Sequence, residues 1–515
     1  MARTPLANAV EGAVAEIADE SARTTRRQLL TGAGAAIAGA GVLGSLARPV
    51  RARAGNGISS SRVVVVGAGL AGLTAAYRLQ QGGVIAEIYE ASGRIGGRCW
   101  TGRDDFADGQ IYEHGGELID SNHIQLKQLV QELGLTLDNL VQSETQGTRQ
   151  LGYFFGRRYT YAQMTDDLKA IWQQIHSDVT AASYPTLYSS YTTRGRQLDQ
   201  MSLYDWIETY VPGGHGSQLG AMLDVAYTIE YGAETTVQAS LNMLYLLGYT
   251  GPGQFRTFGK SNEKLHVRGG NDQIATILAA RLGSQLTTGT PLQAIKRGSD
   301  GTYTLTFGNG SASFTKVADH VVLALPFSIL RGLSFQAAGF NQVKTRAINE
   351  LGMGTNAKVH VQFASRFWRG QGCTGETYAD TGYQNTWESS RSQPGTSGML
   401  VWYTGGNAGV AVGSDTPQSQ VKANFLPKIE PVLPGATAQW NGKVVRDYWT
   451  GYQWTKGSYS YWKAGQYTRF SGAESERSGN CHFCGEHTSQ DFQGYLQGGV
   501  ETGERAASEI LADLK

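Results

Sequence analysis

The chain has little excess charge and few cysteines. Of its 515 residues, 44 are Lys or Arg and 43 are Asp or Glu, so the formal net charge of +1 gives no indication of a nucleic-acid partner. Only four cysteines are present, which excludes a disulfide scaffold. Cys481 and Cys484 form a single CxxC pair, whereas a structural zinc site needs four ligands. No metal is therefore expected in the chemistry, and the two thiols are interpreted as buried and inert.

Long hydrophobic runs are missing beyond the first fifty residues, so the mature protein is expected to have no stable membrane insertion. Near the start, Arg26 and Arg27 precede the Gly- and Ala-rich run Leu29–Leu46, and a small-x-small site follows at Ala52–Ala54. This order resembles a twin-arginine secretory signal. Residues 1–54 are predicted to be that signal, which directs the protein through the twin-arginine export machinery to the periplasm or beyond. The alternative is a transmembrane anchor.

Glycine, in contrast, is abundant. The 68 glycines are roughly one residue in eight, nearly twice the usual share, and predict many tight turns and close backbone approaches. Apolar residues make up 40% of the chain and charged residues 17%, as in globular proteins. A length of 515 residues indicates two to four domains.

A dinucleotide-binding pattern opens the globular part. The β-branched run 63–66 predicts a buried strand, residues 67–72 read Gly-Ala-Gly-Leu-Ala-Gly, and 73–81 have helical spacing. A second strand is predicted over 84–89, and Glu90 closes it about twenty residues after the motif. This is the order strand, GxGxxG, helix, strand, acid. An acid at that place favours an unphosphorylated ribose, as in NAD or FAD.

Each residue of this motif has a physical reason. Gly67 permits the tight turn, Gly69 lets the backbone approach a pyrophosphate, and Gly72 lets the helix pack on the strand. Amides at the helix N-terminus attract the phosphates. The following segment 91–98 carries further glycines and Arg98, and we interpret it as a second loop over the same pyrophosphate.

Both ends of the globular part carry family motifs. GAGLAGL…YEASGRIGGR near the start, CGEHT at 484–488 and GYLQGGVETGERAA at 494–507 resemble the flavin amine oxidase family, which holds monoamine, polyamine and L-amino acid oxidases. The resemblance implies an α/β fold of two domains. The Rossmann-like FAD domain is expected to be discontinuous, over 55–135, 251–334 and 446–515. The substrate-binding domain is expected over 136–250, which reads as helical, and 335–445, which should supply a sheet.

The resemblance implies FAD as the cofactor. Ser458 stands where monoamine oxidases carry the cysteine that bonds to the flavin, so the FAD is predicted to be non-covalent. Glu486 would bond the ribityl chain, and the helix that starts near Tyr495 would direct its N-terminus at the flavin pyrimidine. The predicted cofactor-binding residues are Gly67, Ala68, Gly69, Gly72, Glu90, Ala91, Gly97, Arg98, Gly115, Gly116, Glu117, Leu118, Leu292, Glu486, Gly494, Tyr495 and Leu496.

Four residues resemble the family's catalytic groups. Lys358 matches the lysine that holds a water against flavin N5, where a positive charge can assist reoxidation by O₂. Tyr459 and Tyr495 match the aromatic pair that flanks the substrate amine, and Trp449 matches an aromatic beside the isoalloxazine. The alternatives are a solvent-facing lysine and ordinary core aromatics, since the chain has 25 tyrosines.

Two acids bear on the substrate. Glu117 and Asp120 belong to the segment that lines the flavin and substrate cavity in the family, and facing the cavity they would favour a second positive charge. Turn hydrogen bonding is the alternative. Leu118 stands where snake-venom L-amino acid oxidases carry the arginine that binds the substrate carboxylate, so another arginine must serve if the substrate is an amino acid.

The resemblance therefore implies an oxidase that deaminates a small amine or amino acid, with O₂ or another electron acceptor. A basic L-amino acid such as arginine or lysine is slightly favoured, because it suits an exported scavenging enzyme. The second hypothesis is a monoamine, diamine or polyamine substrate, which suits Tyr459, Tyr495 and the missing arginine. The third is a flavoprotein without amine oxidase activity. A homo-oligomer is compatible with all three.

Overall fold

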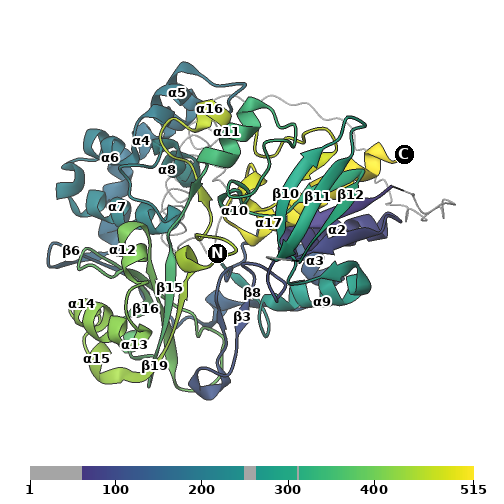
Figure 1. Ribbon diagram of the computed structural model, residues 1–515. Coiled ribbons are helices and arrows are strands. Elements are labelled where there is room, and N and C mark those ends of the chain that lie inside the picture. Colours follow the sequence, from purple (N-terminus) through teal and green to yellow (C-terminus); the bar gives the residue numbers. More distant parts are fainter. Residues whose placement is uncertain (1–60, 249–262, 310–311) are drawn as a thin grey trace, which may run out of the picture.

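The computed structural model describes residues 61–248, 263–309 and 312–515 (Figure 1). The predicted signal over 1–54 lies outside these ranges, as does part of the Gly-Asn-Gly turn at 308–310. Within the described ranges, no helix combines the length and the apolar character needed to cross a bilayer.

A five-stranded parallel sheet forms the first unit. Its order is β21-β13-β1-β2-β9, and every neighbouring pair is parallel. All four valines of β1 are buried, as expected for a strand covered on both faces. The pattern strand, glycine loop, helix, strand is confirmed. The strand bounds are β1 (Val63–Val66), β2 (Ala86–Tyr89), β9 (Leu286–Thr287), β13 (His320–Leu323) and β21 (Cys481–Phe483).

Long helices cover this sheet, and two glycines allow them to approach closely. A Cβ at Gly72 would lie 2.0 Å from the Gly67 carbonyl oxygen, and one at Gly503 would lie 2.4 Å from that of Ala71. Gly72 thus lets helix α2 pack closely against the glycine loop at Gly67, and Gly503 lets helix α17 pack closely against α2. The bounds are α2 (Leu70–Gln81), α3 (Ile124–Glu132), α9 (Asp272–Leu282) and α17 (Leu496–Asp513).

An antiparallel three-stranded sheet and three short strand pairs complete this side of the molecule. The ring of Tyr89, at the end of β2, lies 4.4 Å from that of Phe307, which attaches the three-stranded sheet to the parallel one. The three-stranded sheet holds β10 (Leu292–Arg297), β11 (Tyr303–Asn309) and β12 (Ala312–Ala318). The pairs are β3 (Thr101–Gly102) with β4 (Tyr112–Glu113), β5 (Leu137–Asn139) with β8 (Leu265–Val267), and β14 (Gly352–Met353) with β20 (Ser460–Tyr461).

A seven-stranded mixed sheet forms the second unit, in the order β19-β15-β18-β17-β16-β6-β7. Its register puts one row of side chains across the sheet on one face. In this row Lys358 lies between Asp447 and Tyr403. The row continues from Tyr403 to Asn385 and then to Tyr378. The strands are β6 (Arg149–Phe154), β7 (Arg157–Thr160), β15 (Ala357–Phe363), β16 (Cys373–Ala379), β17 (Gln384–Glu388), β18 (Gly398–Thr404) and β19 (Trp440–Tyr448).

The helical interpretation of residues 136–250 is wrong at its start. Residues 149–160 form the hairpin β6–β7, which joins the edge of the seven-stranded sheet, because Phe155 and Gly156 make a turn with positive φ. The α-helices of this segment begin at Tyr161. They are α4 (Tyr161–Ala182), α5 (Thr193–Gln200), α6 (Leu203–Tyr210), α7 (Gln218–Tyr231) and α8 (Ser240–Gly248), gathered at one end of the sheet in Figure 1.

The remaining helices are short connections around the two sheets. They are α10 (Phe327–Leu330), α11 (Gln342–Glu350), α12 (Gly406–Ala411), α13 (Pro417–Gln420), α14 (Leu426–Ile429), α15 (Ala436–Gln439) and α16 (Tyr467–Phe470). The architecture is therefore α/β in two parts, as predicted. Figure 1 shows the parallel-sheet unit with α2, α9 and α17 on one side and the seven-stranded sheet with α12–α15 on the other.

Candidate active site

The main cavity lies at the carboxyl ends of the parallel strands. This is where ligands bind in open α/β sheets. Glu90 and Leu292 line one half of the cavity, and Glu486 and Tyr495 line the other half. The predicted cofactor residues that line it are Gly67, Gly69, Glu90, Ala91, Gly97, Arg98, Leu292, Glu486, Gly494, Tyr495 and Leu496.

Two glycine loops lie side by side at the centre of this cavity. Gly67 has φ +103°, and Gly69 precedes α2 with no side-chain cap, so the first amides of the helix are left for a ligand. Gly96 and Gly97 belong to the second loop, which pairs with the first through a bridge between Gly69 and Gly96. A cavity with bare backbone and a helix N-terminus suits a pyrophosphate.

Glu90 closes the first half of the site. One of its carboxylate oxygens accepts a hydrogen bond from the Ala68 amide at 2.7 Å, and the other accepts from the amide and hydroxyl of Ser92, both at 2.8 Å. The carboxylate thus ties the end of β2 to both glycine loops. It is half-buried and lines the cavity, where a ribose can reach it.

Arg98 and Glu486 form an ion pair across the other half. An Arg98 guanidinium nitrogen donates to Glu486 at 2.7 Å and to the Ser458 carbonyl at 2.8 Å. Glu486 also accepts from the Ser460 hydroxyl at 2.7 Å and the Gly494 amide at 2.9 Å. Burial opposes its ionisation, but the Arg98 charge and these hydrogen bonds lower the pKa of Glu486 to about 2. The side chain is therefore an acceptor throughout the physiological range.

Helix α17 starts at the same end. Tyr495 is its N-cap residue, no acidic residue lies in its first turn, and Leu496 and Gly499 line the cavity. The positive end of an 18-residue helix therefore faces the site. Negative charge on a ligand is stabilised there.

Several predicted cofactor residues act beside the cavity rather than in its lining. A Cβ at Gly115 would lie 1.9 Å from the Arg98 carbonyl oxygen, and one at Gly116 would lie 2.6 Å from the Leu496 side chain. These two glycines let the loop pack against the cofactor segment. Leu118 is buried in the hydrophobic core. Ala68 contributes its amide to Glu90, and Gly72 packs on Gly67.

Lys358 is fully buried and faces the segment 113–117 of the first unit. Its ammonium donates to the Glu113 carbonyl at 2.6 Å, to the Glu117 carboxylate at 2.7 Å and to the Gly115 carbonyl at 3.3 Å. Trp387 donates to the other Glu117 oxygen at 3.0 Å. Burial works against the ionised carboxylate, yet the Lys358 charge lowers the pKa of Glu117 to about 2. The solvent-facing alternative for Lys358 is thus excluded.

The three predicted aromatics lie close to this region and are buried. The Trp449 indole donates to the His114 carbonyl at 3.0 Å, and Trp449 and Tyr459 form a small cluster with Trp100 and Tyr452. The Tyr459 hydroxyl donates to the Glu230 carbonyl at 2.6 Å and lies 3.0 Å from that of Tyr403. Tyr495 lines the main cavity. That Tyr459 and Tyr495 flank a substrate amine stays a prediction.

Four acids act on one another here: Asp120, Glu230 and Glu263 are buried, Glu376 is half-buried, and sequence reasoning found only Asp120. We call Asp120, Glu230, Glu263 and Glu376 the acidic cluster. The Glu263 amide donates to Asp120 at 2.6 Å, and the negative charges of Asp120, Glu230 and Glu376 all act on Glu263. Among the described residues, neither Glu263 carboxylate oxygen has a hydrogen-bond partner. Burial and these charges raise the pKa of Glu263 well above its usual range.

Arg391 was also missed. It is buried, it acts electrostatically on both Glu263 and Glu376, and one of its guanidinium nitrogens lacks a partner within 61–248, 263–309 and 312–515. With Glu117 it lines a second cavity, between segments 109–117 and 389–394. No periodic or motif signal distinguishes Arg391 or Glu263 in the sequence. By contrast, Ala324–Pro326 in the main cavity could have been found, since they follow the buried strand β13.

These features fit a bound dinucleotide, so fold and site define a dinucleotide-binding oxidoreductase. Residues 70–511 match the family of flavin containing amine oxidoreductases, and the chain belongs to that family. It is 24% identical to an L-amino acid dehydrogenase of Synechocystis sp., over 88% of this chain and 96% of that protein. It is also 24% identical to putrescine oxidase of Kocuria rosea, over 87% and 95%. Cyclohexylamine oxidase of Brevibacterium oxydans has the same fold, with TM-score 0.75, 22% identity and coverage of 88% and 99%.

The protein is thus a flavin-dependent amine oxidase, an oxidoreductase that acts on CH–NH₂ groups. This sets aside the third hypothesis, a flavoprotein without amine oxidase activity. The CxxC thiols have no part in this site. Cys481 and Cys484 are buried and free, and burial raises the pKa of Cys484 to about 12.

Proposed function

We propose that this protein is an exported FAD-dependent oxidase of basic L-amino acids, with arginine or lysine as the type of substrate. The observation that carries the proposal is Glu263, a buried carboxylate whose oxygens lack partners within the described ranges. A buried polar group without hydrogen bonds costs free energy, and a cation that binds in the cluster would offset that cost. The acidic cluster therefore suits a guanidinium or ammonium at the far end of the substrate.

The position of the cluster connects it to the predicted reaction site. Tyr403 contacts Tyr459 through their hydroxyls, and Glu230 and Glu263 act on Tyr403 electrostatically. Lys358 is the strand neighbour of Tyr403 in the same row. A substrate whose amine lies at Tyr459 can thus direct a second cation to Glu263.

Arg391 is our candidate for the substrate carboxylate. One of its nitrogens has no hydrogen-bond partner among the described residues and provides a charge-assisted donor. Arg391 also shares the second cavity with Glu117, the partner of Lys358. This replaces the arginine that is missing at Leu118. The relatives named as L-amino acid dehydrogenase and putative L-amino-acid oxidase support an amino acid substrate.

The chemistry follows from these roles. FAD, when bound, would supply the redox chemistry: it would take a hydride from the carbon that bears the amine and pass the two electrons to O₂, which gives H₂O₂. Hydrolysis of the resulting imine releases a 2-oxo acid and ammonia. Glu263 and Arg391 orient the substrate, Tyr459 and Tyr495 position its amine, and Lys358 supplies a positive charge.

Anaerobic flavin bleaching with matched substrate pairs tests the proposal. L-Arginine is compared with agmatine, L-lysine with cadaverine, and L-phenylalanine with phenylethylamine, since each pair differs only in the carboxylate. Faster bleaching by L-arginine and L-lysine than by their partners supports the proposal. Arg391→Gln should remove that preference. Equal or faster bleaching by agmatine and cadaverine would contradict it.

The second candidate function is a diamine or polyamine oxidase. The same acidic cluster favours it, because two cationic groups are also present in such substrates. The relatives of this chain include a protein named putrescine oxidase, which also fits this candidate. In this case Arg391 would serve only to hold Glu144, with which it forms an ion pair of 2.8 Å. The bleaching experiment distinguishes the two candidates.

We propose that the FAD is bound without a covalent link, since Ser458 cannot form a thioether. Its hydroxyl donates a hydrogen bond to the side-chain oxygen of Asn356 at 2.6 Å. Acid precipitation of the purified enzyme is expected to release all yellow colour into the supernatant. The absorbance of pellet and supernatant near the flavin maximum measures this. Colour that stays with the protein would contradict a non-covalent cofactor.

We also propose export by the twin-arginine route, on the strength of Arg26, Arg27 and the apolar run that follows. The double variant Arg26→Lys, Arg27→Lys is expected to keep the precursor inside the cell. Immunoblots of cytoplasmic, periplasmic and medium fractions measure this, with Arg23→Lys as the matched control. Normal export of the double variant would mean a different route.

A further inference from the structure

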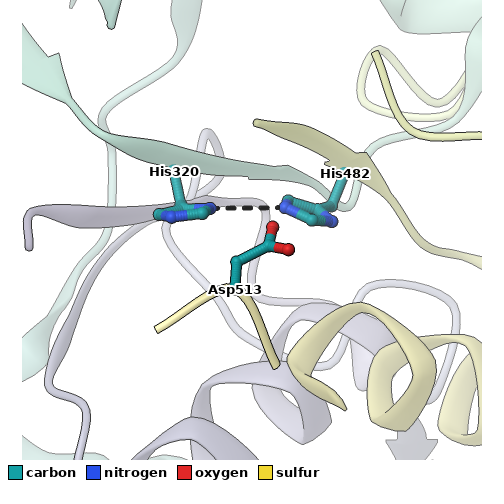
Figure 2. Close-up of side chains that lie close together, drawn as sticks. All are labelled: His320, His482 and Asp513. Atoms are coloured by element: carbon teal, nitrogen blue, oxygen red, sulfur yellow. Dashed lines mark hydrogen bonds between the residues drawn. The ribbon is translucent and has the colours of Figure 1, made fainter. Parts of the chain in front are cut away.

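A second cluster of chemically active side chains lies away from the flavin cavity. His320 is the first residue of β13, and His482 lies in β21, the neighbouring strand. Asp513 is the last residue of α17. The cavity is at the carboxyl ends of the parallel strands, whereas His320 marks the amino end. Figure 2 shows the Asp513 carboxylate directed toward the gap between the two imidazoles.

The orientation of His482 is fixed by a carboxylate. Its Nδ1 lies 2.6 Å from Glu509 Oε2, so Nδ1 carries the proton and donates it. The Nε2 lone pair is then directed at His320, whose Nδ1 lies 3.5 Å away. A histidine whose second nitrogen donates to a carboxylate is the usual arrangement around a bound metal.

The spacing also fits a metal better than a hydrogen bond. With metal–nitrogen distances of about 2.0–2.1 Å, two ligands of a tetrahedral Zn²⁺ lie about 3.4 Å apart. The two imidazole nitrogens are 3.5 Å apart, so the hydrogen bond drawn between them in Figure 2 is a long and weak one. The ligand atoms of His320, His482 and Asp513 all lie within 4.8 Å of one another.

We propose that His320, His482 and Asp513 form a binding site for a divalent cation of the Zn²⁺ class, with water as the fourth ligand. Both histidines are buried and Asp513 is exposed, so an ion can arrive from solvent. Arg477 donates to Asp513 Oδ2 at 2.5 Å, so the ion would bind through Asp513 Oδ1. The site would join the end of α17 to β13 and β21 and thereby stabilise the helix whose N-terminus faces the flavin cavity.

Calorimetric titration of the untagged holoenzyme, stripped with EDTA, with ZnCl₂ tests the site. One equivalent per chain is expected to bind, and the melting temperature should rise by a few degrees at saturation. Asp513→Asn and His482→Gln should each weaken binding at least about tenfold. His215→Gln is the matched control, because His215 lies beside Glu208 and Asp224 outside the proposed site.

Asp513→Asn keeps the test decisive if the buried His482 variant folds poorly, since Asp513 is exposed and the change is isosteric. Flavin absorbance reports that each variant is folded. Absence of saturable Zn²⁺ binding to the wild type would overturn the proposal. Unchanged binding by Asp513→Asn would overturn the three-ligand site, and loss of binding in His215→Gln would place the ion elsewhere.

Discussion

Lys358→Met is expected to slow reoxidation of the reduced enzyme by O₂ by about 10²–10³-fold, while reduction by substrate changes by less than about threefold. The Lys358 ammonium is buried, and a positive charge in a water-excluded site stabilises incipient superoxide far more than it would in water. Substrate reduction involves no comparable development of negative charge on O₂. Stopped-flow measurement of the two half-reactions separates these effects.

The ion pair with Glu117 complicates this variant. Removing Lys358 alone leaves a buried carboxylate without its counter-charge, which costs about 3–5 kcal/mol. The double variant Lys358→Met, Glu117→Gln removes both charges and is the matched control, and Glu117→Gln alone keeps the lysine. We expect slow reoxidation in both variants that lack Lys358 and near-normal reoxidation in Glu117→Gln. Equal slowing of both half-reactions in the double variant would remove the role given to Lys358.

Sequence motifs predicted the cofactor end of this protein well because its constraints are local. The turn at Gly67, the packing of Gly72 and the acid at Glu90 lie within one strand-helix-strand unit, so their spacing along the chain fixes their geometry. The C-terminal motif around Glu486 was recognised from its resemblance to a family. The structure then brought it within 2.7 Å of Arg98, a contact that no spacing rule contains.

The substrate end was predicted less well because its residues converge from distant segments. Glu230 lies in the last turn of α7, Glu376 lies in β16, and Glu263 comes from a connection before β8. Each is an ordinary charged residue in its own segment. The row that joins Lys358 to Tyr403 exists only through strand pairing. The hairpin β6–β7 was missed for a similar reason, since its strands are stabilised by the neighbouring β16.

Glu263→Gln is expected to lower kcat/KM for L-arginine and L-lysine by about 10²-fold, since a charge-assisted hydrogen bond in a buried site contributes about 1.5–3 kcal/mol. Glutamine keeps the shape and loses the charge. L-Leucine, which has no distal cation, is the matched control substrate and should be affected by less than about twofold. Steady-state H₂O₂ formation with the three amino acids measures the change.

The pH dependence distinguishes recognition of a cation from a structural role. The pKa of Glu263 is raised above its usual range, because the carboxyl is buried and other acids surround it, so the free enzyme holds it protonated at low pH. A guanidinium binds the ionised form better, and the KM for L-arginine should therefore fall as pH rises through that pKa. The guanidinium of arginine keeps its charge throughout, and L-leucine, which carries the same α-amine, controls for titration of that amine. The KM of Glu263→Gln should lose this fall. A profile that is unchanged in the variant, or an equal loss with L-leucine, would show that Glu263 supports the fold rather than binding the substrate.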